Sequence, residues 1–296
     1  MKYNLLGNSI LKVSQVSFGC MSLGDDHESN ATLLHNAFDQ GINYFDTADV
    51  YQNGFNEITV GKAFKGIRDK VMIATKVGNQ IRKDGNGFDW NPTKVYILKS
   101  IDDSLKRLQT DYIDLYQLHG GTMEDPIDET IEAFELLKAQ GKIRFYGISS
   151  IRPAVIQEYV KRSNISSVMM QYSLLDRRPE ELCLNLLHQH NIGVLARGSL
   201  AKGLLIDKPA APFLKYSNEE VKTAALSVKS VAVNTKRSST DVALKFVLHH
   251  PAITSAVVGM RTEQQLNDGL EAEKSDLLSL DDYSTLSHSI AKNHYE

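Results

Sequence analysis

Residues 113–149 read IDLYQLHGGTMEDPIDETIEAFELLKAQGKIRFYGIS and contain a strand, a helix and a second strand. The first seven and the last seven residues of this stretch each form a mostly apolar run of strand length. Between them, residues 128–140 have the apolar spacing of a helix, which Asp125-Pro126 begins and Gly141 ends. Parallel strands require a long crossover of this kind, so the stretch predicts a parallel βαβ unit.

The same alternation runs through all 296 residues without a low-complexity linker. The eight predicted strands are Val16–Cys20, Asn43–Asp46, Val71–Lys76, Ile113–His119, Ile143–Ser149, Val168–Gln171, Gly193–Arg197 and Ser255–Val258. The predicted helices between them include Thr93–Leu108, Asp128–Gln140, Pro179–His190, Thr240–His249 and Thr262–Glu273. Eight such units predict an α/β fold, a (β/α)8 TIM barrel, and we expect residues 1–296 to form a single domain.

An open, doubly wound sheet is the competing α/β fold. A sheet of that kind that binds a dinucleotide has a G-x-G-x-x-G turn after its first strand, and residues 18–24, FGCMSLG, lack this spacing. Outside the eight units, residues 3–6 and 11–13 flank Gly7-Asn8-Ser9 as an N-terminal β-hairpin, which we expect at the barrel bottom. Residues 217–234 and 280–290 predict extra helices near the C-terminus.

The composition excludes several classes of function. With 33 basic and 36 acidic residues the net charge is −3, which argues against non-specific binding to nucleic acid or to a membrane surface. No run approaches the roughly 18 apolar residues of a membrane span, and MKYNLLGNS at the start does not resemble a secretory signal. Cys20 and Cys183 lie far apart, and the nine histidines form no H-E-x-x-H motif, so no metal is expected. These features predict a cytoplasmic protein and leave its oligomeric state open.

Ionisable residues stand at the carboxyl ends of three consecutive predicted strands, where TIM barrels carry their function. Asp46, Lys76 and His119 end these strands, and Tyr51 lies in the loop that follows the first of them. Each residue alone has an ordinary structural role, as a loop cap, a solvated lysine, a buried histidine or a packing aromatic. Their coincidence at one end of the barrel favours a catalytic site.

These side chains suit the reduction of a carbonyl group. A phenol with a pKa of about 10 is a poor proton donor, and a nearby ammonium group lowers that pKa. A lysine in a partly buried pocket needs a counter-charge, which Asp46 would supply. A histidine can orient the carbonyl oxygen. None of these groups provides a hydride, so the arrangement implies a nicotinamide cofactor.

The sequence resembles the aldo-keto reductases over nearly its whole length. The firmest matches are residues 41–51 (GINYFDTADVY), 74–76 (ATK) and 110–119 (TDYIDLYQLH). The resemblance maps the catalytic tetrad of that family onto Asp46, Tyr51, Lys76 and His119. In the family the tyrosine donates a proton, the lysine and aspartate tune its acidity, and the histidine orients the carbonyl group. The resemblance therefore implies a barrel that binds NADPH across its strand ends and reduces aldehydes or ketones.

The resemblance also implies cofactor contacts, with several departures from the family pattern. Ser149-Ser150 stands where the family has Ser-Asn for the nicotinamide amide. The family's glutamine on the sixth strand aligns with Met169, and Gln171, two residues on and on the same face, is our candidate to replace it. Arg197 takes the place of the aromatic residue that stacks under the nicotinamide. A guanidinium plane can also stack on a ring, and an outward salt bridge is the alternative role.

After the eighth strand, Gly259-Met260-Arg261 resembles the family's phosphate-binding segment. Backbone N–H groups at a helix N-terminus and an arginine both bind phosphate, so Arg261 favours NADPH and NADP+ over NADH. Asp268 is a candidate contact to the adenine, because Gly269 stands where the family often has asparagine. The complete predicted cofactor set is Gly19, Cys20, Met21, Asp46, Ser149, Ser150, Gln171, Arg197, Gly198, Ser199, Leu200, Lys202, Gly203, Gly259, Arg261, Gln265 and Asp268.

The predicted substrate-binding residues are Tyr51, Trp90 and His119, and the predicted partner is a small carbonyl compound. Trp90 is the single tryptophan and lies in a long loop after the third strand, where it lines a pocket or caps the rim. The short loop 120–125 predicts an open pocket.

Two other functions compete with the reductase interpretation. The β subunits of voltage-gated potassium channels resemble the same family and act largely as partner-binding modules, so a redox sensor with slow catalysis is the alternative. The complete tetrad argues against it. A metal-dependent isomerase would need several carboxylates or histidines at the strand ends, which the last four predicted strands lack.

Overall fold

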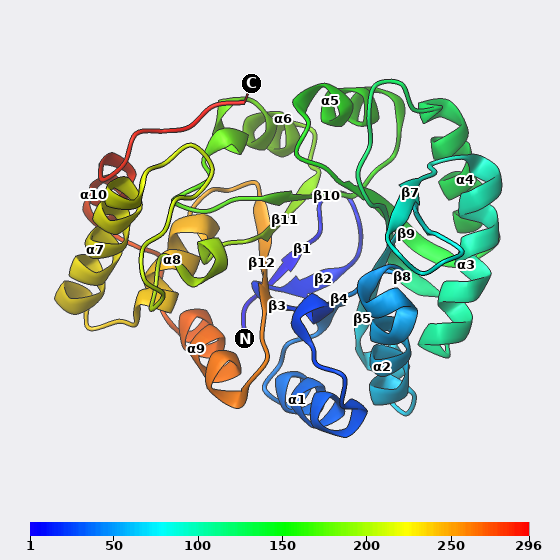
Figure 1. The fold of residues 1–296 in the computed structure, drawn as a ribbon, viewed down its shortest axis with the longest axis horizontal. Coiled ribbons are helices and arrows are strands. Elements are labelled where there is room, and N and C mark those ends of the chain that lie inside the picture. The colour runs from blue at the N-terminus through cyan, green and yellow to red at the C-terminus, as the bar shows by residue number, and fades with distance from the viewer. Residues whose placement is uncertain (296) are drawn as a thin grey trace.

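The computed structural model describes residues 1–295, which form a closed barrel of eight parallel strands inside a ring of helices (Figure 1). Around the barrel the strands follow the order β3, β4, β5, β8, β9, β10, β11 and β12, after which β12 pairs with β3. Their bounds are β3 Val16–Gly19, β4 Tyr44–Asp46, β5 Met72–Val77, β8 Ile113–Leu118, β9 Ile143–Ser149, β10 Ser167–Gln171, β11 Gly193–Arg197 and β12 Ile253–Gly259. All eight predicted strands are confirmed with small shifts at their ends, and the closed barrel excludes the open sheet.

Eight helices alternate with the strands and cover the outside of the barrel. They are α1 His27–Asp39, α2 Phe55–Phe64, α3 Lys94–Leu108, α4 Ile127–Ala139, α5 Pro153–Arg162, α6 Cys183–Gln189, α8 Ser239–Leu248 and α9 Glu263–Lys274. Side-chain caps begin several of them: Thr93 accepts a hydrogen bond from the Tyr96 backbone N–H at the start of α3. The predicted extra helices are confirmed as α7 (Asn218–Thr235) and α10 (Leu280–His288), which pack together outside the barrel (Figure 1).

The N-terminal hairpin consists of β1 (Tyr3–Leu5) and β2 (Lys12–Ser14) and closes the barrel bottom, as predicted. Its turn fits tightly against the strand starts: a Cβ on Gly7, whose φ is +56°, would lie 2.4 Å from the Ser166 carbonyl oxygen. Leu6, Leu11 and Val13 are buried in a cluster with residues from inside the barrel. Burying these apolar side chains fixes the hairpin in place.

The predicted continuous helix over residues 179–190 was wrong. The segment divides into a short 3-10 helix, η4 (Arg178–Glu181), and α6, because Leu182 between them has φ −144°. The C-terminal tail lies against η4, where the Tyr295 backbone N–H donates to Glu181 (3.1 Å). Such contacts with a distant segment leave no periodic signal in the local sequence.

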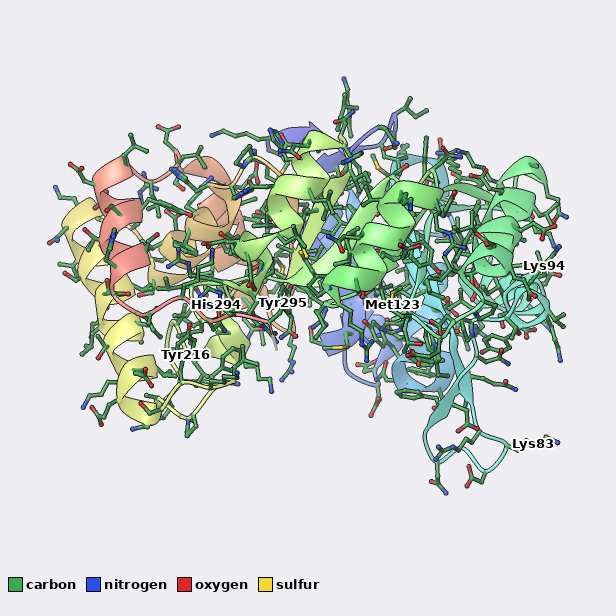
Figure 2. All side chains as sticks on the ribbon, turned by 90° about the horizontal axis from the view of Figure 1, so that it is seen from above. Lys83, Lys94, Met123, Tyr216, His294 and Tyr295 are labelled. Carbon is green, nitrogen blue, oxygen red and sulfur yellow. The ribbon has the colours of Figure 1, made fainter. Side chains whose placement is uncertain are left out.

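A second hairpin, made of β6 (Asn79–Ile81) and β7 (Phe88–Trp90), replaces the predicted loop after the third strand. Figure 2 shows this hairpin, with Lys83 labelled near its tip, extending beyond the barrel at the end opposite β1 and β2. The remaining 3-10 helices are η1 Cys20–Ser22, η2 Tyr51–Gly54, η3 Arg68–Lys70 and η5 Ala201–Gly203. Within residues 1–295, no helix is both long and apolar enough to span a membrane.

Candidate active site

Asp46, Tyr51, Lys76 and His119 meet at the carboxyl end of the barrel. Asp46 ends β4, Lys76 lies in β5, His119 follows β8, and Tyr51 begins η2 in the loop after β4. The Lys76 ammonium donates hydrogen bonds to Asp46 Oδ2 (2.6 Å) and to the Tyr51 hydroxyl (3.2 Å). The rings of Tyr51 and His119 meet edge to face, with centroids 5.9 Å apart. The structure therefore brings together the four residues that the sequence proposed as a tetrad.

Lys76 and Asp46 form a buried ion pair. A buried charge needs both a partner and hydrogen bonds, and Lys76 also donates to the Thr47 carbonyl (2.7 Å). Burial is the largest single influence and lowers the pKa of Lys76, but the charges of Asp46 and Tyr51 and the hydrogen bonds to both together outweigh it, so the pKa of the ammonium is raised. Burial raises the pKa of Asp46, and Lys76 and a hydrogen bond from Gln117 oppose that shift. Lys76 is thus held as a cation beside the Tyr51 hydroxyl.

The loop that carries Tyr51 has an unusual backbone. Gln52 and Asn53 both have positive φ, at 50° and 53°, which is an uncommon conformation for residues with side chains. Asn56 holds the loop in place, since its amide donates to the Cys20 carbonyl (2.8 Å) and accepts from the Thr47 hydroxyl (2.6 Å). These hydrogen bonds fix where the Tyr51 ring enters the site.

The His119 side chain is half-buried, and its imidazole is neutral near pH 7. Burial is the main cause that lowers its pKa to about 3, and the charges of Lys76 and Arg197 contribute to the same shift. Its Nδ1 atom is buried without a hydrogen-bond partner among the described residues. The backbone around it is anchored, because the His119 N–H donates to the Val77 carbonyl (2.7 Å).

A cavity of about 540 Å³ opens over the tetrad. Its lining residues are Met21, Val50, Tyr51, Gln52, Asn79, Phe88 and His119. Trp90, predicted to bind substrate or cap the rim, is not among them, and its place in the lining is taken by Phe88 of the same hairpin. The Trp90 indole instead donates to Asp125 (2.8 Å).

The predicted cofactor contacts follow the rim of the barrel from β9 to β3. Neighbouring strands align Ser149 with Met169, Gln171 with Arg197, and Gly259 with Gly19. Members of the set from these strand ends and the loops after them are Gly19, Cys20, Met21, Ser149, Ser150, Gln171, Arg197, Gly198, Ser199, Leu200, Lys202, Gly203, Gly259 and Arg261. Gln265 and Asp268 lie on α9, which begins just beyond Arg261.

Several of these side chains already have roles within the protein. The Ser150 hydroxyl accepts from the Arg152 backbone N–H (3.2 Å), and Asp268 accepts from Gln264 (2.7 Å). The Gln265 side chain accepts from the Arg261 backbone N–H (2.9 Å). Within residues 1–295 no ion pair involves Arg197, so the outward salt bridge considered for it does not form there.

A family model described as "Aldo/keto reductase family" matches residues 15–291. The chain belongs to the aldo/keto reductase family. It is therefore an oxidoreductase of a family that acts on small carbonyl compounds and generally uses NAD(P)H. This family membership is what the sequence resemblance predicted.

Among curated relatives of this reductase, an uncharacterized oxidoreductase, YqkF of Bacillus subtilis, is 48% identical over 97% of this chain and 95% of its own length. L-galactose dehydrogenase of Arabidopsis thaliana is 33% identical over 90% of this chain and 86% of its own. The aldo-keto reductase AKR11C1 of Bacillus halodurans, in its holo form, superposes with a TM-score of 0.95 at 46% identity, covering 100% of this chain and 98% of the other. The apo form of AKR11C1 gives a TM-score of 0.86.

The structure of the reductase adds polar groups that the sequence analysis did not single out. Gln117 points into the barrel and donates to Asp46 Oδ1 (3.3 Å). Glu57 of α2 is fully buried, where it accepts from the Thr75 hydroxyl (2.6 Å) and pairs with Arg107 (2.6 Å). A glutamine inside the mostly apolar run IDLYQL was a signal for the first. No sequence signal distinguished Glu57 from a solvent-facing glutamate on a helix.

Residues 1–295 contain no cluster of three or more histidine, cysteine or carboxylate side chains arranged to hold a metal ion. Cys20 and Cys183 are both free and buried. Burial strongly raises the pKa of the Cys20 thiol, so this cysteine is held in the unreactive thiol form beside the site.

Proposed function

We propose that this protein is an NADPH-dependent reductase that converts aldehydes or ketones to alcohols, working as a single domain over residues 1–296. One observation carries the proposal. The Lys76 ammonium contacts both Asp46 and the Tyr51 hydroxyl, and Tyr51 lines the cavity beside a neutral His119. This arrangement places a proton donor and a neutral hydrogen-bond donor side by side in the cavity.

The residues of this site divide the work of a carbonyl reduction. A bound reduced nicotinamide supplies the hydride. Tyr51 donates its proton to the carbonyl oxygen, and the Lys76 ammonium, 3.2 Å away, stabilises the phenolate that remains. Asp46 keeps Lys76 charged and oriented. His119 Nδ1 has no acceptor among the described residues, so we assign the proton of the neutral ring to Nε2, which donates to the same carbonyl oxygen.

The rim residues fit a nicotinamide dinucleotide. Ser199 Oγ is buried without a partner among the described residues, which is the kind of polar atom that a bound ligand satisfies. The backbone beyond Arg197 turns at Gly198 (φ +70°), beside the Gln171 side chain. We assign the nicotinamide amide to Ser149, Ser150 and Gln171, ring stacking to Arg197, and the 2′-phosphate to Arg261.

The cavity favours a small carbonyl compound with an apolar portion. Met21 and Phe88, at 67% and 52% exposed, present apolar surface to it, while Gln52 and Asn79 supply polar groups. L-galactose dehydrogenase and the glycerol dehydrogenase AKR11B4 of Gluconobacter oxydans, 26% identical to this chain with a TM-score of 0.87, are named for oxidising alcohols.

A cytoplasmic location stays a prediction.

The test follows oxidation of NADPH, and separately of NADH, by near-ultraviolet absorbance with a panel of aldehydes and ketones. We expect sustained turnover with NADPH and a loss of at least about 100-fold in kcat for Tyr51→Phe. Tyr112→Phe is the matched control, since Tyr112 precedes β8 at the opposite end of the barrel and should retain activity. Tight NADPH binding with only a stoichiometric burst on every carbonyl would instead identify a redox sensor.

A further inference from the structure

The Trp90 indole lies against the backbone at Gly78, after β5, and at Gly120, the residue after His119. A Cβ on Gly78 would come within 2.7 Å of the indole atom Cζ3, and a Cβ on Gly120, the residue after His119, within 3.2 Å. Both glycines have positive φ, at 122° and 148°. The indole therefore packs directly on two stretches of bare backbone, and any side chain there would displace it.

The polar edge of the indole is held as well. Trp90 Nε1 donates to Asp125 Oδ1 (2.8 Å), and the same carboxylate accepts from the Thr122 backbone N–H (2.7 Å) and the Thr122 hydroxyl (2.9 Å). Asp125 thus ties Trp90 to the loop after His119. The hydrogen bond from Trp90 joins the β6–β7 hairpin to this loop.

His119 needs support of this kind. The orientation of a functional histidine is usually set by a hydrogen bond to its second ring nitrogen. Here Nδ1 is buried and has no such partner among the described residues. The position of the His119 ring therefore depends on the backbone turn that carries it. The β6–β7 hairpin holds this turn in two ways: through Trp90, and through Asn79, whose amide donates to the His119 carbonyl (3.4 Å).

We propose that Trp90 is a positioning residue for carbonyl reduction: it clamps the turn of residues 118–121 and thereby sets the direction of the His119 imidazole. The inference rests on the proposed function, in which His119 orients the carbonyl group. It also couples substrate contact to catalysis, because Phe88, on the same face of the hairpin two residues before Trp90, lines the cavity. Trp90 itself is not among the residues that line the cavity.

A double-mutant cycle tests whether Trp90 acts through His119. Trp90→Ala and Asp125→Ala are each made in the wild-type and His119→Gln backgrounds, with Arg82→Ala as control, since Arg82 pairs only with exposed groups of the same hairpin. We expect Trp90→Ala to lower kcat about tenfold in the wild-type background and less than about twofold in His119→Gln. Trp90→Phe should restore part of the loss. An equal loss in both backgrounds, or a rise in KM alone, would overturn the proposal.

A second measurement does not depend on turnover. In nitrogen-15 spectra of the imidazoles, we expect Trp90→Ala and Asp125→Ala to shift or broaden the His119 ring signals, while Arg82→Ala leaves them unchanged. Unchanged His119 signals in a folded Trp90 or Asp125 variant would refute the clamp. If the wild type reduces no carbonyl but these signals move as expected, the proposed function fails and the clamp stands. Should Trp90→Ala not fold, Asp125→Ala carries both measurements.

Discussion

The Lys76 ammonium lies 2.6 Å from Asp46 Oδ2, and both side chains are buried at the end of the barrel. A buried pair of this kind adds little net stability by itself, because removing two charges from water offsets most of their attraction. Losing one member is different, since the other charge is then left alone in the interior. The pair is therefore explained by function: Asp46 keeps Lys76 charged beside the Tyr51 hydroxyl.

Lys76→Met should lower the free energy of unfolding by about 3 kcal/mol, because Asp46 keeps a buried charge without a partner. The double variant Asp46→Asn/Lys76→Met should recover most of this loss but not the activity. Urea unfolding and kcat, measured on the same preparations, separate the two effects. A double variant as unstable as Lys76→Met would show that the pair stabilises the fold in its own right.

His119 should make stability fall with acid. Its pKa is about 3 in the folded protein against 6.5 as its ordinary value, so between these pH values the unfolded chain binds a proton that the folded protein excludes. Stability is therefore fully present above pH 6.5 and decreases as the pH falls, by about 1.4 kcal/mol per pH unit once well below it. Unfolding measured from pH 7 to 4.5 should show a shallower decline for His119→Gln.

The control for this titration is His190→Gln, which removes an exposed histidine. Burial also lowers the pKa of His249 and His250, but those residues contribute equally to both proteins. Identical pH slopes for wild type and His119→Gln would contradict the lowered pKa of His119.

Arg261→Ala should weaken NADPH binding by about tenfold or more and leave NADH binding nearly unchanged, because only NADPH carries the 2′-phosphate. Quenching or calorimetric titration gives both dissociation constants without any carbonyl substrate. Lys274→Ala, at the far end of α9, is the control with the same charge change. Equal losses for the two cofactors would remove Arg261 from the phosphate site.

Arg107→Met should destabilise the protein by about 3 kcal/mol, because Glu57 is fully buried and Arg107 is the cation paired with it (2.6 Å). Arg144→Met is the comparison, since Asp114 keeps its second partner, Arg68, at 2.7 Å, and we expect a loss below about 1 kcal/mol there. Thermal and urea unfolding measure both. If both variants lose similar unfolding free energy, the remaining pair with Arg68 does not protect the buried Asp114 carboxylate.

The sequence by itself determined the barrel and the four residues of the proposed tetrad. Strands that are buried on both faces must be largely apolar, and their crossover helices must repeat an apolar stripe, so both leave a recognisable signal. In a parallel barrel all the carboxyl ends lie on one side, so residues at strand ends, such as Asp46 and Lys76, could be grouped without coordinates.

Only the tertiary structure decided how these residues are supported. The hydrogen bond from Trp90 to Asp125, the buried pair of Glu57 and Arg107, and the break at Leu182 all depend on segments far apart in the chain. The low pKa of His119 likewise arises from burial and from charges on other strands. Local patterns carry no information about such contacts, because desolvation and packing are properties of the folded neighbourhood and not of the residue type.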